Sequence, residues 1–477
     1  TIALADHSAA IYVINGANGL NASTGNITVG TTSVGIYANN TTGSIQNDGI
    51  ITVGQGSQGM YGSHSGSVIN TVTVTSTAAN ATGVFTDGPV PFINSGTINL
   101  LGDDSVGMFS LRAPGSSVPL QNTSTGVIKI GNSTNPANPG VAMYSENEDE
   151  VMINDGYIEV GQGSLGIYKF GFPTPSGTIR QNGTIVVGDG GTGLYSQGDL
   201  VTIAPTSTIT LLGSNETVGI YATAGSIVTN NSSNLSIGSG NYGAVLETGA
   251  SFINNAPITL GTNEVFVYSA VNPAYPGVLG GTVTNNFPIV MSGANNVAFY
   301  TTNSDTVVNN ATIDGRGGTG NIGIYNKGGS ITNTAPIFAG KSNIVNSTNP
   351  AVNNYAVGIY GETTKIVNTA QIEVGDDGIG IYVKGNTAAT IAENHGHIIL
   401  NGNSAIGLYA ENGTIVNETG GVIDVNGNNG IGMAGVTSDI INKGVINLNG
   451  NTGTGMLGNT GGTIENRGVI NIGSGSD

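Results

Sequence analysis

The feature that most constrains this chain is a repeat of about 24 residues that continues along the whole sequence. Residues 33–54, SVGIYANNTTGSIQNDGIITVG, show one copy. The copy holds three short runs rich in apolar and β-branched residues, at 35–37, 44–47 and 50–53, separated by polar turns. Because a fixed period of about 20–50 residues is typical of solenoids, the repeat decides the architecture before any single motif does.

An aromatic residue closes the first run in most copies and gives the alignment of the repeat. The aligned positions are Tyr12, Tyr37, Tyr61, Phe85, Phe109, Tyr144, Tyr168, Tyr195, Tyr221, Val245, Tyr268, Tyr300, Tyr325, Tyr360, Tyr382, Tyr409, Ala434 and Leu457. They define about 18 copies with a mean spacing of roughly 26 residues. We therefore expect a bare coil of about 24 residues, and longer steps that carry inserted loops.

The second and third runs repeat as well. The second closes on Asn in nearly every copy, as in Ile45-Gln46-Asn47, and the third reads Ile-x-Val-Gly, as in residues 158–161. Alternation of period two places both branched residues on one face of a strand. Runs of three to five such residues between Gly, Asn, Asp and Ser are typical of short strands. The sequence therefore predicts an all-β chain, a parallel β-helix with three short strands per coil.

The same alternation predicts which side chains face inward. The Ile position of Val-Gly-Ile-Tyr is apolar throughout, so it points into the core and the neighbouring Tyr points outward or onto a corner. We expect the aromatics of successive coils to stack on one another. The Asn that closes the second strand is expected to form an inward ladder, with each amide bonded to the next and to the backbone at the bend.

Composition limits the class of protein and its partners. The net charge of −18 argues against binding to nucleic acid or to an anionic membrane surface. The uninterrupted repeat favours one elongated domain over residues 1–477, without a signal peptide or an apolar run long enough to span a membrane. Because solenoid ends need caps and none is evident, we interpret the segment as a piece of a longer chain.

Recognition is expected where copies deviate from the repeat, because loops held by a rigid frame carry binding. Insertions follow the aromatic strand at 111–119, 169–177 and 270–281, and follow the third strand at 132–140 and 342–356. Phe170, Phe172 and Tyr275 lie in Pro-containing insertions and are candidate binding anchors. The alternative is that these aromatics fold back onto the coils.

The densest acidic stretch lies beside these loops. Together with the aromatics, the candidate partner-binding residues are Arg112, Glu146, Glu148, Asp149, Glu150 and Lys169. Such a patch can attract a basic partner or hold Ca²⁺, although acidic runs are mostly solvated turns. Stacking also predicts that Lys129 of one coil pairs with Glu159 of the next.

The sequence predicts no catalytic residue, no metal and no cofactor. Two GxGxxG matches, at 54–59 and 161–166, are followed by another short strand instead of the helix that a dinucleotide site needs. His395 and His397 lack a clear third ligand for zinc. The outward acids Glu159, Asp314, Glu373 and Asp424 occupy equivalent positions in separate coils and are interpreted as surface residues.

The repeated GIYA…GxIxNxGxIxVG coil, most specifically at 218–222, 357–360 and 379–383, resembles the passenger domains of large fusobacterial autotransporter adhesins, the RadD-like family. The resemblance covers nearly the whole chain. It implies a right-handed β-helix exported through a C-terminal β-barrel and displayed at the bacterial outer membrane. It also implies adhesion to other bacteria, host glycans or host receptors.

Three functions are therefore considered. The first is an adhesin segment that presents loops to a host-cell receptor, a glycan or a partner bacterium. The second is a passive spacer stalk, with binding elsewhere in the full protein. The third is a polysaccharide-acting enzyme, which would need clustered carboxylates with an Arg or Lys in a groove.

Overall fold

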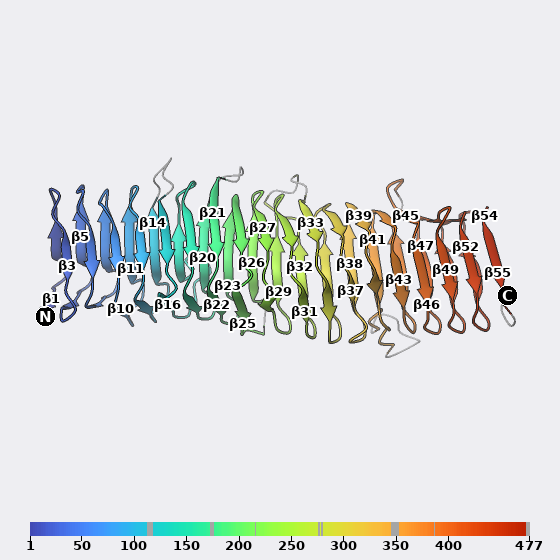
Figure 1. Cartoon of the computed structure of the whole chain (residues 1–477), viewed down its shortest axis with the longest axis horizontal. Helices are drawn as coiled ribbons and strands as arrows, with labels where there is room; N and C mark the ends of the chain where they lie inside the picture. The colour runs from blue at the N-terminus through green and yellow to red at the C-terminus, as the bar shows by residue number, and fades with distance from the viewer. Residues whose placement is uncertain are drawn as a thin grey trace. The chain divides into compact units, whose positions relative to one another are not determined.

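The structure is a computed structural model, and it describes residues 1–111, 118–171, 176–214, 216–274, 277, 280–344, 353–385 and 387–473. Contacts divide the chain into two compact units, Thr1–Ala244 and Val245–Asp477, and each is described by itself. The described residues form short β-strands joined by turns (Figure 1).

The first unit contains three parallel sheets. Within each sheet, a strand pairs with the strands that come three before and three after it in the sequence. The aromatic sheet runs from β2 (Ala9–Val13) to β26 (Val218–Thr223). The asparagine sheet runs from β3 (Gly19–Asn21) to β27 (Ile227–Asn230), and the third sheet from β1 (Ile2–Ala3) to β28 (Asn234–Ser236). One coil is thus three strands, such as β5 (Val34–Asn39), β6 (Ile45–Asn47) and β7 (Ile50–Thr52).

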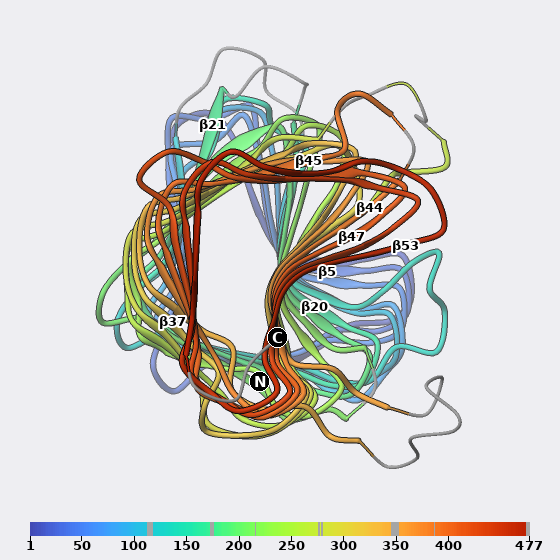
Figure 2. The same ribbon diagram turned by 90° about the vertical axis from the view of Figure 1, so that its right-hand side faces the viewer.

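The second unit repeats this plan. Its aromatic sheet includes β32 (Val265–Ser269) to β53 (Thr454–Asn459), its asparagine sheet β30 (Ser251–Asn254) to β54 (Ile464–Asn466), and its third sheet β31 (Ile258–Leu260) to β55 (Val469–Ile472). Within this unit, β44 (Ile379–Lys384), β47 (Ile406–Glu411) and β53 lie over one another when viewed along the stack of coils (Figure 2). The prediction of a right-handed parallel β-helix with three short strands per coil and about 18 coils is confirmed.

The core follows from the register of these sheets. Ile36 pairs with Met60, and both side chains are fully buried because they fill the inward position of the aromatic strand. The preceding Gly35 is required by a close approach, since a Cβ there would lie 2.4 Å from the Gly59 carbonyl oxygen. Each coil buries its apolar residues against its neighbours, as a solenoid must.

The inward asparagine ladder is present in both units. In the second unit, Asn285 Nδ2 donates to Asn309 Oδ1 at 2.9 Å, and Asn309 Nδ2 donates to Asn333 Oδ1 at 2.7 Å. These side chains are fully buried. Amides such as Asn47 also donate to the backbone at the bend, here to the Gly49 carbonyl at 3.2 Å. The predicted ladder is therefore confirmed.

The aromatic ladder lies on the outer side of the aromatic sheet. Its ring centroids are 4.4–5.5 Å apart from one coil to the next, and the rings are half-buried in most coils. In the second unit, Tyr360 and Tyr382 are stacked at 4.4 Å with 11° between their planes. The prediction that Ile points in and Tyr points out is confirmed.

The insertions follow the two strands that the sequence indicated. Residues 112–117, 172–175, 275, 276, 278, 279 and 345–352 lie outside the described residues, so these parts of the insertions are not placed. The insertion at 132–140 is described throughout, between β16 (Val127–Ile130) and β17 (Val141–Ser145).

Candidate functional site

The structure separates the predicted partner-binding residues into three groups. Arg112, Phe172 and Tyr275 lie outside the described residues. Glu146, Glu148, Asp149 and Phe170 are at least partly accessible, and Phe170 is 40% exposed at the end of β20 (Leu165–Phe170). Lys169 and Glu150 are buried, with 0% and 1% exposure.

The burial of Lys169 corrects the expectation that it is displayed by a loop. Lys169 lies in register with Ser145 and Ser196 of the neighbouring coils, at the inward position that follows the outward Tyr168. Its Nζ donates to Asp199 Oδ1 at 2.7 Å and to the carbonyl oxygens of Asn147 and Glu148 at 3.0 Å each. The side chain therefore binds interior groups instead of facing solvent.

The expectation that Glu150 is accessible to a partner is corrected in the same way, because its side chain is buried. Its carboxylate accepts hydrogen bonds from Ser110, at 2.9 Å, and from Ser145. Burial raises the pKa of Glu150 from 4.5 to about 7, while these two bonds and the charge of Lys169 act in the opposite direction. Burial likewise raises the pKa of Asp199. The acidic stretch is thus partly an interior polar cluster.

The raised pKa of Glu150 predicts a pH dependence of stability. A carboxyl group whose pKa is higher in the folded state binds more protons when folded, so stability falls as pH rises from 4.5 to about 7. We expect Glu150 to contribute a loss of up to about 3 kcal/mol across that window. Urea denaturation at pH 5 and pH 8 should show a smaller loss in the Glu150→Gln variant than in the parent chain. Equal losses in both proteins would contradict the prediction.

Exposed charges form pairs along the stacks. Lys129 Nζ lies 2.8 Å from Glu159 Oε2, as predicted, and both side chains are 43% exposed. His397 Nε2 lies 2.7 Å from Asp424 Oδ2, so this histidine contacts a carboxylate of the next coil. Within the described residues, no group of three or more His, Cys, Asp or Glu side chains could hold a metal ion.

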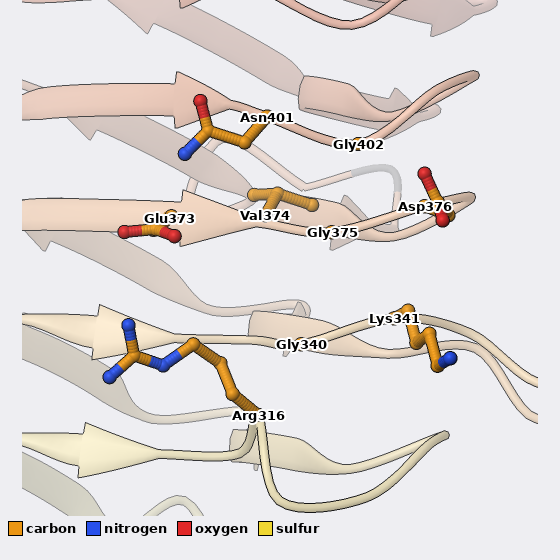
Figure 3. Close-up of a pocket in the computed structure, with 9 residues that line it drawn as sticks. All are labelled: Arg316, Gly340, Lys341, Glu373, Val374, Gly375, Asp376, Asn401 and Gly402. Carbon is orange, nitrogen blue, oxygen red and sulfur yellow. The ribbon is translucent and has the colours of Figure 1, made fainter.

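A groove of about 300 Å³ crosses four coils of the second unit at the end of its third sheet. Figure 3 shows Arg316 and Glu373 toward the strands, and Lys341 and Asp376 nearer the turns. Arg316 follows β37 (Ile313–Asp314), and Glu373 belongs to β43 (Gln371–Val374). Two basic and two acidic side chains thus share one groove.

The guanidinium group in this groove is already engaged. Arg316 donates to both carboxylate oxygens of Asp314, at 2.9 and 2.7 Å, and lies 3.9 Å from the centre of the Phe338 ring. The hydrogen bonds that Arg316 donates to Asp314 raise the pKa of the guanidinium group. This arrangement fixes the position of the guanidinium group and makes Arg316 a poor proton acceptor.

A second cavity, of about 350 Å³, lies on the aromatic sheet of the second unit, and we call it the tyrosine pocket. It is lined by aromatic, aliphatic and amide side chains and by one glycine: Asn295, Val297, Gly320, Ile322, Asn353, Asn354, Tyr355, Val357, Tyr360, Ile379 and Tyr382. The stacked rings of Tyr360 and Tyr382 belong to the ladder, whereas Tyr355 comes from the insertion at 342–356.

Hydrogen bonds fix the end of this insertion over the sheet. Asn354 and Asn343 exchange two backbone hydrogen bonds, at 2.8 and 3.1 Å, and Asn354 Nδ2 donates to Asn295 Oδ1 at 2.8 Å. These bonds hold Tyr355 in the lining of the pocket, with 38% of its surface exposed. Sequence reasoning identified the insertion and the ladder but not this pocket, whose residues come from several coils.

The described coils define the class of this protein, a right-handed parallel β-helix of repeated three-strand coils. Residues 53–165 and 229–421 match the family described as BigA third pectate lyase-like domain. This match covers more than half of the chain, and the chain belongs to that family. Membership in this family supports the interpretation that the chain is a domain like those of bacterial autotransporter passengers. No curated protein and no solved structure matches the chain.

The family name describes a likeness of fold and carries no information on catalysis here. Across the parts of the chain that the structure describes, no helix is long and apolar enough to cross a membrane.

Proposed function

We propose that this chain is an adhesive segment of a bacterial surface protein of the autotransporter type, and that it binds neutral sugars at the tyrosine pocket. The match to the family supports the part of this proposal that makes the chain a domain of the autotransporter passenger type. The narrower resemblance to fusobacterial adhesins, and display at the outer membrane, belong to this proposal as well.

The observation that carries the proposal is the chemistry of the tyrosine pocket. Tyr355, Tyr360 and Tyr382 offer ring surfaces that can pack against the C–H face of a pyranose. Asn295, Asn353 and Asn354 place amide groups in the lining, and an amide can both donate to and accept from a sugar hydroxyl. Asn354 Nδ2 already donates to Asn295 Oδ1 at 2.8 Å, and Asn295 Nδ2 donates to Asn263 Oδ1 at 3.0 Å, so a sugar would use the second N–H groups and oxygen lone pairs of these amides. The volume of about 350 Å³ is in the range of small-ligand sites. The lining side chains carry no charge, which favours a neutral ligand over an acidic one.

Removing Tyr355 should abolish most of this binding. Because Tyr355 is exposed and lies outside the aromatic ladder, Tyr355→Ala should leave the coils intact while it removes a ring from the pocket. We expect the dissociation constant to rise at least about 10-fold, the effect of losing a well-placed aromatic anchor. Binding is measured on an array of neutral and acidic oligosaccharides, followed by titration of the best ligand.

Phe287 provides a matched control. It is 44% exposed in the same unit and does not line the tyrosine pocket, so Phe287→Ala should bind like the parent chain. An equal loss of binding in both variants, or no loss in Tyr355→Ala, would place the site elsewhere.

A polysaccharide-acting enzyme is the second candidate, and the groove in Figure 3 is the observation that favours it, because Arg316, Lys341, Glu373 and Asp376 share one recess. The bidentate contact of Arg316 with Asp314 argues against a role as base. Release of shortened products from an oligosaccharide by the purified chain, lost in a Lys341→Ala variant, would favour the enzyme.

A further inference from the structure

Glu150, Lys169 and Asp199 form a buried triad in the first unit that the proposed binding site does not use. Their side chains are 1%, 0% and 0% exposed. Glu150 precedes β18 (Val151–Asn154), and Asp199 begins β24 (Asp199–Ile203). The register places both carboxylates at one inward corner of the coil, with Lys169 in the coil between them.

Small residues occupy equivalent positions of this corner in neighbouring coils. Glu150 and Asp199 share their position with Gly177 of the coil between them, and Lys169 shares its position with Ser145 and Ser196. An ammonium group here is enclosed by two carbonyl oxygens and the Asp199 carboxylate, whose Oδ2 also accepts a bond from Ser196 at 3.3 Å. Burying these charges is costly, and a neutral product would remove that cost.

We propose that Lys169 and Asp199 condense into an intramolecular amide bond during folding, with Glu150 carrying the proton. No disulfide can link the coils, because the chain contains no cysteine. The amide would tie β20 covalently to β24. This inference does not depend on the tyrosine pocket.

The geometry is suited to this reaction. Lys169 first passes one ammonium proton to the Asp199 carboxylate, whose Oδ1 lies 2.7 Å from Nζ. The two remaining N–H groups stay on the carbonyl oxygens of Asn147 and Glu148, so the nitrogen lone pair faces Asp199. Nζ then bonds to Cγ, and one carboxyl oxygen leaves as hydroxide.

Glu150 completes the proton balance from the other side of Lys169. Its carboxyl group interacts electrostatically with Lys169, and burial favours its protonated form. The protonated Glu150 carboxyl group gives its proton to the departing hydroxide and is then reprotonated by the second proton, which Nζ loses as the amide forms. One amine and one carboxylic acid thus give one amide and one water, and nothing is oxidised or reduced.

Mass spectrometry of the folded, purified chain tests the proposal. We expect an intact mass lower than that of the sequence by one water, and a branched peptide that joins Lys169 to Asp199 after digestion with a protease that does not cut at lysine. Glu150→Gln should keep the full mass. In Asp199→Asn the bond, where it forms, should release ammonia instead of water.

Lys129→Gln is the control, because Lys129 contacts Glu159 at 2.8 Å on the surface, and this variant should still lose one water. A folded parent chain with the full mass, or a missing water that maps to other residues, would overturn the proposal. The intact mass of the parent chain therefore tests the proposal even if none of the variants folds.

Discussion

Replacing Asn309 by Ala should lower the free energy of unfolding by about 3 kcal/mol. Asn309 is fully buried, and it accepts from Asn285 and donates to Asn333 at 2.9 and 2.7 Å. The substitution leaves a buried N–H group and a buried carbonyl oxygen without their partner, and each unpaired group costs about 1–3 kcal/mol. Urea denaturation followed by circular dichroism measures the loss.

The neighbouring Asn310 gives a matched control. It donates to Asn286 Oδ1 at 3.0 Å in an exposed row of the same coils. Because water can replace that bond, Asn310→Ala should change the free energy of unfolding by no more than about 0.5 kcal/mol. Similar effects of the two substitutions would show that the inward ladder does not stabilise the fold.

Replacing Lys169 by Met should cost about 3–5 kcal/mol, because the variant leaves the buried Asp199 carboxylate without Lys169 as its partner, whether the two groups pair as ions or through the proposed amide. The double variant Lys169→Met with Asp199→Leu should recover part of this loss, since an apolar pair avoids the burial of an unpaired charge. Thermal and urea denaturation of the three proteins measure the difference.

The exposed pair of Lys129 and Glu159 is the comparison. Both side chains are 43% exposed, and Lys129→Met should cost less than about 1 kcal/mol. A Lys169→Met variant as stable as Lys129→Met would contradict the buried placement of Lys169.

The coil could be predicted from the sequence because its signals recur about 18 times. The positions of Ile36, Tyr37 and Asn47 follow from period-two alternation and from turns at fixed spacing, and stacking repeats the same environment in each coil. The pairing of Lys129 with Glu159 was predictable for the same reason.

The burial of Lys169 follows from the same alternation. Its position follows an outward Tyr and is therefore inward by the same alternation, and Ser145 and Ser196 occupy it in the adjacent coils. The expectation that a charged residue at the start of an insertion is displayed is wrong here, because Lys169 is fully buried. The alternation of the strand extends to Phe170, and it placed the ammonium group inside.

The tyrosine pocket could not be predicted in this way. Tyr360 and Tyr382 are ladder residues like those of other coils, and Asn295 lies about 60 residues before Tyr355 in the sequence. They meet because hydrogen bonds from Asn354 fix the end of an irregular insertion over the sheet. An insertion has no repeat to define its path, so only the folded chain shows what it approaches.

The most direct test of an adhesive role is the binding of this purified chain, coupled to fluorescent beads, to bacterial and host cells in the presence and absence of neutral oligosaccharides. We expect that the beads attach, that a neutral sugar releases them, and that beads carrying the Tyr355→Ala variant do not attach. Failure of the parent chain to bind any cell or sugar would contradict the proposed function and favour a passive spacer.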